Sequence, residues 1–255
     1  MSLHYHQSSL KLIGQEAKFP PETSALLRNV ESDLGCALPA SVREWYALKD
    51  AATILKKYSN ADHPVPLKDL GLTGSDSCDA VDVTAKGERF LTFLIENQGV
   101  CVWAFELDQA EDPTVVVRWN EPGAVWQLAA DRFSDFIYTW LWDHHHRREC
   151  GIQAIGSPLA QTDLGFLRTR YSEMLSTASW PEVRQYRFHT QNQWLLLWNG
   201  ASQADWYLGA DSPSNLFDFA LTVWQHIGLP DWVVDCLPEG SQVDDIADRL
   251  KAKLG

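Results

Sequence analysis

The chain has 255 residues, which is enough for one or two domains that each bury a hydrophobic core. Apolar residues make up 45% of it and there are 12 tryptophans, a composition that indicates folded protein and excludes a disordered chain. The formal net charge of -13 repels phosphate backbones, which argues against nucleic-acid binding. The same charge would favour encounter with a basic protein partner, although keeping the protein soluble is its simpler explanation.

The N-terminal region predicts two helices joined by a tight break. Gly35 can adopt the positive φ that closes a helix starting near Glu22, and Pro39 has the φ of a helix's first turn. Ser41 and Glu44 fit the S-x-x-E capping box. Apolar residues then recur near helical spacing and predict one apolar face at Val42, Trp45, Ala52 and Leu55.

A long loop, four strands and a helix follow. Ser59 to Ser77 is rich in Pro, Gly, Asp and Ser, so a loop is expected there. Short β-branched and aromatic runs then predict strands, with Trp103 and Phe105 on one face of the second. These strands and the closing helix are expected at residues 89–95, 100–107, 114–119, 125–129 and 133–146.

A second unit is expected after a linker. Glycine and proline are frequent in residues 147–163, between two periodic regions. Further helices and strands are expected at residues 164–175, 182–191, 193–198, 205–209, 213–227 and 241–254, with Gly228 and Pro230 ending the fifth element and Ser241 capping the last. The predicted organisation is a domain at 1–146, a linker at 147–163 and a smaller α+β unit at 164–255.

The two halves share a weak likeness. Each has a hairpin around an Asn-Gln pair followed by an amphipathic helix, and three residues coincide when those helices are aligned: Asp135 with Asp218, Phe136 with Phe219, and Thr139 with Thr222. Convergence on a common hairpin-and-helix pattern is the simpler explanation, and a distant duplication is the alternative.

The cysteine pattern indicates a reducing compartment. The five cysteines are widely spaced and include no C-x-x-C pair, which is cytosolic usage. Residues 1–15 lack the apolar core of a signal peptide, and no later window approaches the roughly 18 apolar residues of a membrane span. We therefore expect a soluble, cytoplasmic protein that does not bind membranes.

His144, His145 and His146, with Cys150 beyond them, are the one dense group of candidate metal ligands. An i, i+4 pair on a helix can bind one side of a zinc ion, but a structural zinc site needs four ligands. The other histidines are scattered singly. Histidines near the negative end of a helix are the simpler explanation, so we expect no metal and no cofactor.

Acidic pairs such as Glu106 with Asp108, or Glu111 with Asp112, would imitate a catalytic acid and base. They lie in predicted loops, where solvated carboxylates are ordinary. The chain has no G-x-S-x-G, H-E-x-x-H, Walker or G-x-G-x-x-G motif. We expect no catalytic residues and no enzymatic activity.

The tryptophans divide into two groups. Those on predicted apolar stripes are expected in the core: Trp45, Trp103, Trp140 and Trp224. Three others crowd two facing strands, where an exposed aromatic patch would mark a partner site: Trp194, Trp198 and Trp206.

Several short motifs follow one another between Glu31 and Asp143. They are Leu34-Gly35, Leu38-Pro39, Val42-Arg43-Glu44-Trp45-Tyr46, Asp62-His63-Pro64, Leu70-Gly71, Glu96-Asn97-Gln98-Gly99-Val100-Cys101-Val102-Trp103-Ala104 and Asp112-Pro113. Their order resembles the SUKH superfamily, which includes fungal cell-wall-synthesis regulators and many bacterial immunity proteins. The resemblance leaves the second unit unexplained, and the Asn-Gly pair that many relatives carry is replaced here by residues 48–52.

The resemblance implies an α+β fold with a mainly antiparallel sheet backed by helices, no catalytic residues, and a role in binding other proteins. In bacterial relatives the partner is typically the catalytic domain of a polymorphic toxin, neutralised by occlusion. Acidic side chains beside the hairpin are the candidate contacts: Glu96, Asn97, Gln98, Asp108, Glu111 and Asp112. Ordinary turn formation is the alternative explanation for each of them.

The leading hypothesis is thus a non-enzymatic protein-binding module, an immunity protein whose partner is a toxin domain, for instance a basic one. A second hypothesis is an intracellular adaptor or regulator with no toxin partner. A third, a metal-dependent hydrolase, depends only on the triple histidine.

Overall fold

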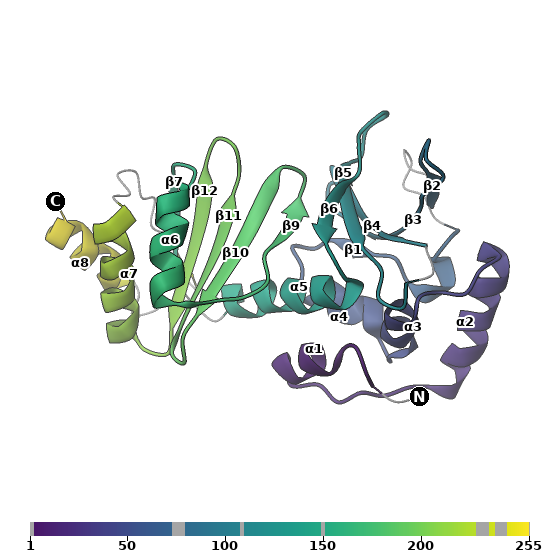
Figure 1. The fold of residues 1–255 in the computed structure, drawn as a ribbon. Helices are drawn as coiled ribbons and strands as arrows, with labels where there is room; N and C mark the ends of the chain where they lie inside the picture. The colour runs from purple at the N-terminus through teal and green to yellow at the C-terminus, as the bar shows by residue number, and fades with distance from the viewer. Residues whose placement is uncertain are drawn as a thin grey trace. The chain divides into compact units, whose positions relative to one another are not determined.

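The structure is a computed structural model that describes residues 3–72, 80–107, 110–148, 151–227, 235–237 and 244–254. Helices and two antiparallel sheets give an α+β fold, which confirms the predicted class (Figure 1). The chain divides into a first unit, Met1–Trp142 with Ala178–Pro181, and a second unit, Asp143–Thr177 with Glu182–Gly255.

The first unit begins with four helices, α1 (Gln7–Leu12), α2 (Pro21–Leu34), α3 (Ala40–Ala47) and α4 (Ala51–Lys57). Helix α2 ends as predicted at Gly35, whose φ of 68° is a left-handed conformation that glycine adopts without a Cβ clash. The apolar face predicted for one helix is shared by two. Asp50 has a φ of 61°, and this left-handed residue separates α3 from α4.

The predicted capping box of Ser41 and Glu44 does not form. Pro39 is the residue before α3, so Ser41 lies inside the helix, where the first turn has no side-chain cap. The buried Glu44 carboxylate instead accepts hydrogen bonds of 2.5 to 2.9 Å from the backbone amides of residues 4, 5 and 6. These amides precede or begin α1, so one carboxylate fastens the N-terminal segment to α3.

The first sheet has the strand order β1-β3-β4-β5-β6, and β2 also pairs with β3. All four predicted strands are present, and β1 and β2 are additional. Strand β1 lies inside the loop predicted at 59–77. It contains Pro64, and a proline is tolerated in a strand at the edge of a sheet because its missing N–H need not bond to a second neighbour. The strands are β1 (His63–Pro64), β2 (Val81–Val83), β3 (Arg89–Ile95), β4 (Cys101–Glu106), β5 (Val115–Trp119) and β6 (Gln127–Ala130).

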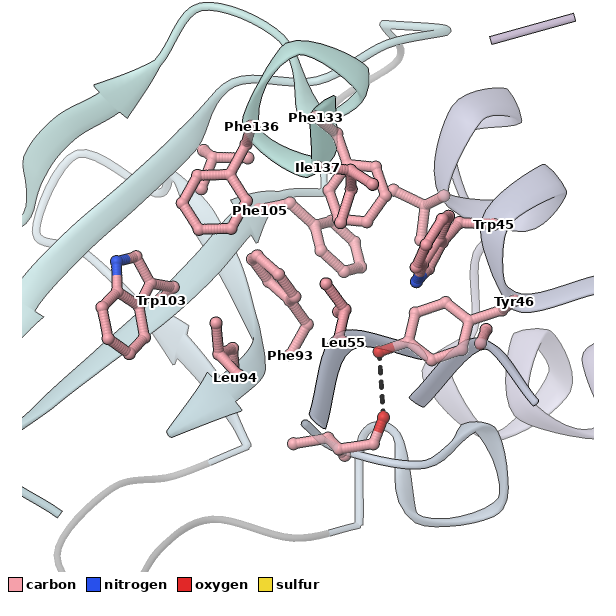
Figure 2. Close-up of a cluster of buried hydrophobic side chains, with 14 of the residues drawn as sticks. Trp45, Tyr46, Leu55, Phe93, Leu94, Trp103, Phe105, Phe133, Phe136 and Ile137 are labelled. Carbon is pink, nitrogen blue, oxygen red and sulfur yellow. Dashed lines mark hydrogen bonds between the residues drawn. The ribbon is translucent and has the colours of Figure 1, made fainter. Parts of the chain in front are cut away.

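The core of the first unit lies between one face of this sheet and helices α3, α4 and α5 (Phe133–Arg148), as Figures 1 and 2 show. The rings of Phe133 and Phe136 meet that of Phe93 nearly edge-on, with centroids 5.2 and 5.4 Å apart. Trp103 and Phe105 lie in the same core, as predicted. Edge-to-face aromatic packing adds specificity to the burial of apolar area.

The second sheet has the strand order β13-β7-β12-β11-β10-β8, and β9 also pairs with β10. Its strands are β7 (Gly151–Gly156), β8 (Ser172–Glu173), β9 (Thr177–Trp180), β10 (Val183–His189), β11 (Gln193–Asn199), β12 (Ala204–Ala210) and β13 (Asp235–Leu237), and its helices are α6 (Gln161–Arg170), α7 (Pro213–Ile227) and α8 (Asp244–Leu254). The helix ends predicted at Gly228, Pro230 and Ser241 lie outside the described residues.

Residues 147–163, expected as a linker, contain the inner strand β7. Its side chains Ile152 and Ala154 are buried in the second core. Gly151 lies so close to the neighbouring strand that a Cβ would come within 1.9 Å of the Leu208 carbonyl oxygen. The glycine that suggested a linker is therefore required by close strand approach.

The helices compared in the two halves make the same local bond. Thr139 in α5 donates its hydroxyl to the carbonyl of Asp135 at 2.8 Å, and Thr222 in α7 donates to that of Asp218 at 2.8 Å. Such bonds to the residue four positions earlier are common for threonine in helices.

A buried ion pair organises the second unit. The Arg187 guanidinium donates to both carboxylate oxygens of Asp143, at 2.5 and 2.6 Å, and both residues are at most 2% exposed. Further bonds of 3.0 Å join Arg187 to the Leu175 carbonyl and the Thr177 hydroxyl. A buried pair is tolerated when, as here, its remaining donors are satisfied.

Removing one partner of this pair should be costly. Asp143→Ala leaves a buried guanidinium without its counter-ion, and we expect the free energy of unfolding to fall by about 3 to 5 kcal/mol. The matched double substitution Asp143→Leu with Arg187→Met removes both charges and should cost less. Urea unfolding measures both, and a double variant as unstable as the single one would contradict this.

The Glu44 contact predicts a local effect. Glu44→Ala should release the N-terminal segment, because three amides lose a charged acceptor, and should cost about 2 to 3 kcal/mol. Hydrogen exchange at residues 4–6 should rise strongly in this variant and stay unchanged in the exposed-residue control Glu16→Ala. Unaltered exchange in Glu44→Ala would show that the carboxylate does not hold the segment.

Candidate functional site

The predicted contacts in the turn after β3 mostly maintain the turn. Glu96 is only 5% exposed, and its carboxylate accepts the backbone amides of Gln98 and Val100 at 2.7 and 3.2 Å. Asn97 donates its backbone amide to the Asp62 carboxylate at 3.1 Å. The side chain of Gln98 is exposed and accessible to a partner.

The predicted acidic loop is likewise partly structural. Asp112 accepts hydrogen bonds from the Ser134 amide at 3.0 Å and the Ser134 hydroxyl at 2.5 Å, so it caps α5. Glu111 is exposed, and its carboxylate accepts the Tyr5 hydroxyl at 3.1 Å. Asp108 lies outside the described residues.

The triple histidine lies in the last turns of α5. The ring of His146 is 5.1 Å from that of His145 and 5.2 Å from that of Trp194. Within the described ranges, which leave out Cys150, no three His, Cys, Asp or Glu side chains are placed to hold a metal ion. Burial, and then the charges of His145 and His189, lower the pKa of His146 to about 4.

The crowded tryptophans of the second sheet do not form an exposed patch together. Trp206 is fully buried, whereas Trp194 and Trp198 are partly buried. Trp194 covers Gly209, where a Cβ would come within 2.0 Å of the indole ring. At least two of these three rings therefore serve packing of the sheet.

A groove of about 900 Å³ lies on the face of the first sheet opposite α5. Side chains alternate along β5, so Val115 and Val117 enter the main core while Val116 and Arg118 line the groove. The walls come from the loop at residues 84–88 and the loop at residues 122–126. We call this feature the outer groove.

Trp126 forms the most organised wall of the outer groove. Its indole nitrogen donates to the Asp82 carboxylate at 2.8 Å, and the Arg118 guanidinium lies 4.7 Å from its ring centroid. The Phe90 ring is 5.4 Å away. A hydrogen bond, a cation–π contact and an aromatic contact thus hold this large side chain in place.

Apolar residues also surround the outer groove. Val125 on its wall is 76% exposed, and Leu128, which pairs with Val116 across the strands, is 48% exposed. Such apolar surface around an aromatic wall is typical of a protein-binding site. This groove was not predicted from the sequence, although Asp82 and Arg118 are single charged residues within otherwise apolar strands and could have indicated it.

The low pKa of His146 predicts acid sensitivity. Native His146 is neutral down to about pH 4, whereas an unfolded histidine binds its proton near pH 6.5, so the unfolded state binds more protons between these values. The free energy of unfolding should therefore fall as pH drops through this window.

His146→Phe keeps a ring beside Trp194 and removes the titrating group. On acidification to about pH 4, the free energy of unfolding should fall less in this variant than in wild type, and the difference should be on the order of 2 kcal/mol. Urea unfolding at three pH values measures this, with the exposed His4→Gln as control. Identical pH dependence in wild type and His146→Phe would refute the assignment.

Across the described segments, no helix is both long and apolar enough to cross a membrane.

Comparison with known proteins found one informative likeness: residues 21–139 match the model of the SMI1 / KNR4 family (SUKH-1). No match was found among curated proteins or among solved structures. The matched range runs from the start of α2 into α5, so it contains the first sheet, most of its helices and the outer groove. Residues 21–139 therefore form a domain of the SUKH superfamily.

Proposed function

We propose that this protein is a non-enzymatic binding module that acts as an immunity protein, covering the catalytic domain of a toxin. The observation that carries the proposal is the outer groove: a domain of the SUKH superfamily presents a fixed aromatic wall with exposed apolar neighbours. That surface suits the occlusion of a partner protein.

The use of the buried and half-buried carboxylates supports a role without catalysis. Glu44, Asp62, Glu96 and Asp112 all accept hydrogen bonds from backbone amides of their own chain. An acid and base couple needs two carboxylates that face one pocket with different environments. These four instead hold turns, a helix start and the N-terminal segment.

The gene next to this one separates the two binding hypotheses. A toxin-like product encoded there favours immunity, whereas a lone gene favours an adaptor or regulator. The hydrolase hypothesis gains no support from His144, His145 and His146, since among described residues their neighbourhood lacks a metal-binding group of three.

Co-expression with the adjacent toxin-like product tests the proposal. We expect wild-type protein to restore growth, to co-purify with the product and to inhibit its activity at a ratio of about one to one. Persistent toxicity with both proteins present at similar levels would contradict the immunity role.

The acidic loop is tested separately by Glu111→Lys, because Asp112 caps α5 and its charge reversal would also disturb the fold. If the exposed Glu111 carboxylate meets a basic partner, this substitution should weaken capture by about fivefold or more. Unchanged affinity would remove this loop from the interface.

A further inference from the structure

We propose that the outer groove receives an uncharged, apolar segment of the partner protein, anchored by one aromatic or large aliphatic side chain against Trp126. This inference rests on the proposed function and identifies the chemistry that the partner presents. It differs from the simple expectation, drawn from the net charge of -13, that contact is made through basic side chains.

The charges around the outer groove are balanced. Its lining contains two acidic and two basic side chains, Asp82, Glu88, Lys86 and Arg118. The Asp82 carboxylate already faces the Arg118 guanidinium at 3.6 Å and the Trp126 indole nitrogen at 2.8 Å. The Glu88 carboxylate accepts the Thr84 hydroxyl at 2.9 Å.

A basic segment would therefore find Asp82 already facing Arg118, and it would find the exposed carboxylate of Glu88 in a lining that also carries Lys86. It would lose hydration on entering without gaining a net attraction, because the basic side chains of the lining equal the acidic ones in number. An uncharged side chain pays no such penalty, and it covers Val125, of which 76% is exposed. Charge complementarity thus favours an apolar occupant in an otherwise acidic protein.

The dimensions and stiffness of the outer groove agree with this occupant. A volume of about 900 Å³ lies within the range of pockets that enclose small ligands, so it accommodates a large side chain with part of its backbone. Because Trp126 is already held by Asp82, Arg118 and Phe90, little rotamer freedom is lost when a partner packs on it.

The first experiment needs no toxin. The full chain, with nitrogen-15 in its indole groups, is titrated with N-acetyl-tryptophanamide, N-acetyl-leucinamide and N-acetyl-argininamide, and Trp126→Phe identifies the Trp126 resonance. We expect the two uncharged amides to shift that resonance saturably in the millimolar range and the arginine amide to shift it at least about fivefold more weakly. Equal or tighter arginine binding, or no shift with any probe, would overturn the proposal.

Val125→Glu should weaken binding of the uncharged probes by about fivefold or more, because it places a charge on the groove wall. Leu175→Glu is the matched control: Leu175 is 43% exposed and belongs to the second unit. Equal effects of both substitutions would overturn the assignment to the groove.

Sedimentation tests whether a second copy of this chain occupies the groove. A wild-type dimer that Val125→Glu abolishes would overturn the proposal in favour of self-association.

The second experiment uses the adjacent toxin-like product. Val125→Glu with Leu128→Glu should weaken capture about tenfold, and wild-type affinity should change less than about threefold between 50 and 500 mM salt. Capture that is steeply salt-dependent, or insensitive to the double variant, would overturn this inference and leave the immunity role standing. Absence of capture while the uncharged probes still bind Trp126 would instead refute the immunity role alone.

Discussion

The packing of α5 against strands β3 and β4 is the constraint on which the first unit depends. Phe133 and Phe136 meet Phe93 edge-on in the core, so this face of the sheet is committed to the helix. Because strand side chains alternate, residues such as Val116 and Arg118 must then face the other way. The outer groove is a consequence of how the core is filled.

Some acidic side chains of this protein bind its own backbone, whereas others are exposed to solvent. Glu44 holds the N-terminal segment, Glu96 holds a turn and Asp112 caps a helix, so each carboxylate replaces water as the acceptor for backbone amides. Glu111, in contrast, remains exposed. The net charge of the sequence therefore bears on solubility and on the rate of encounter with a partner. The contact surface depends instead on which side chains the fold exposes.

The sequence was sufficient to predict an element where a local pattern is typical of one backbone conformation. Gly35 ended a helix as predicted, and β3 was predicted with its observed bounds. Glycine in β7 was misleading, because a close neighbouring strand and a linker both favour residues without a side chain. The outer groove required tertiary information: Trp126 and Asp82 are distant in sequence, and only strand pairing brings them within a hydrogen bond.

The matched family range stops at residue 139, but α5 continues without a break to Arg148. Its earlier part carries Phe133 and Phe136 in the first core, and its later part carries Asp143, the counter-ion of Arg187 in the second unit. The boundary between the two units thus falls within α5, and the matched family range ends three residues before it.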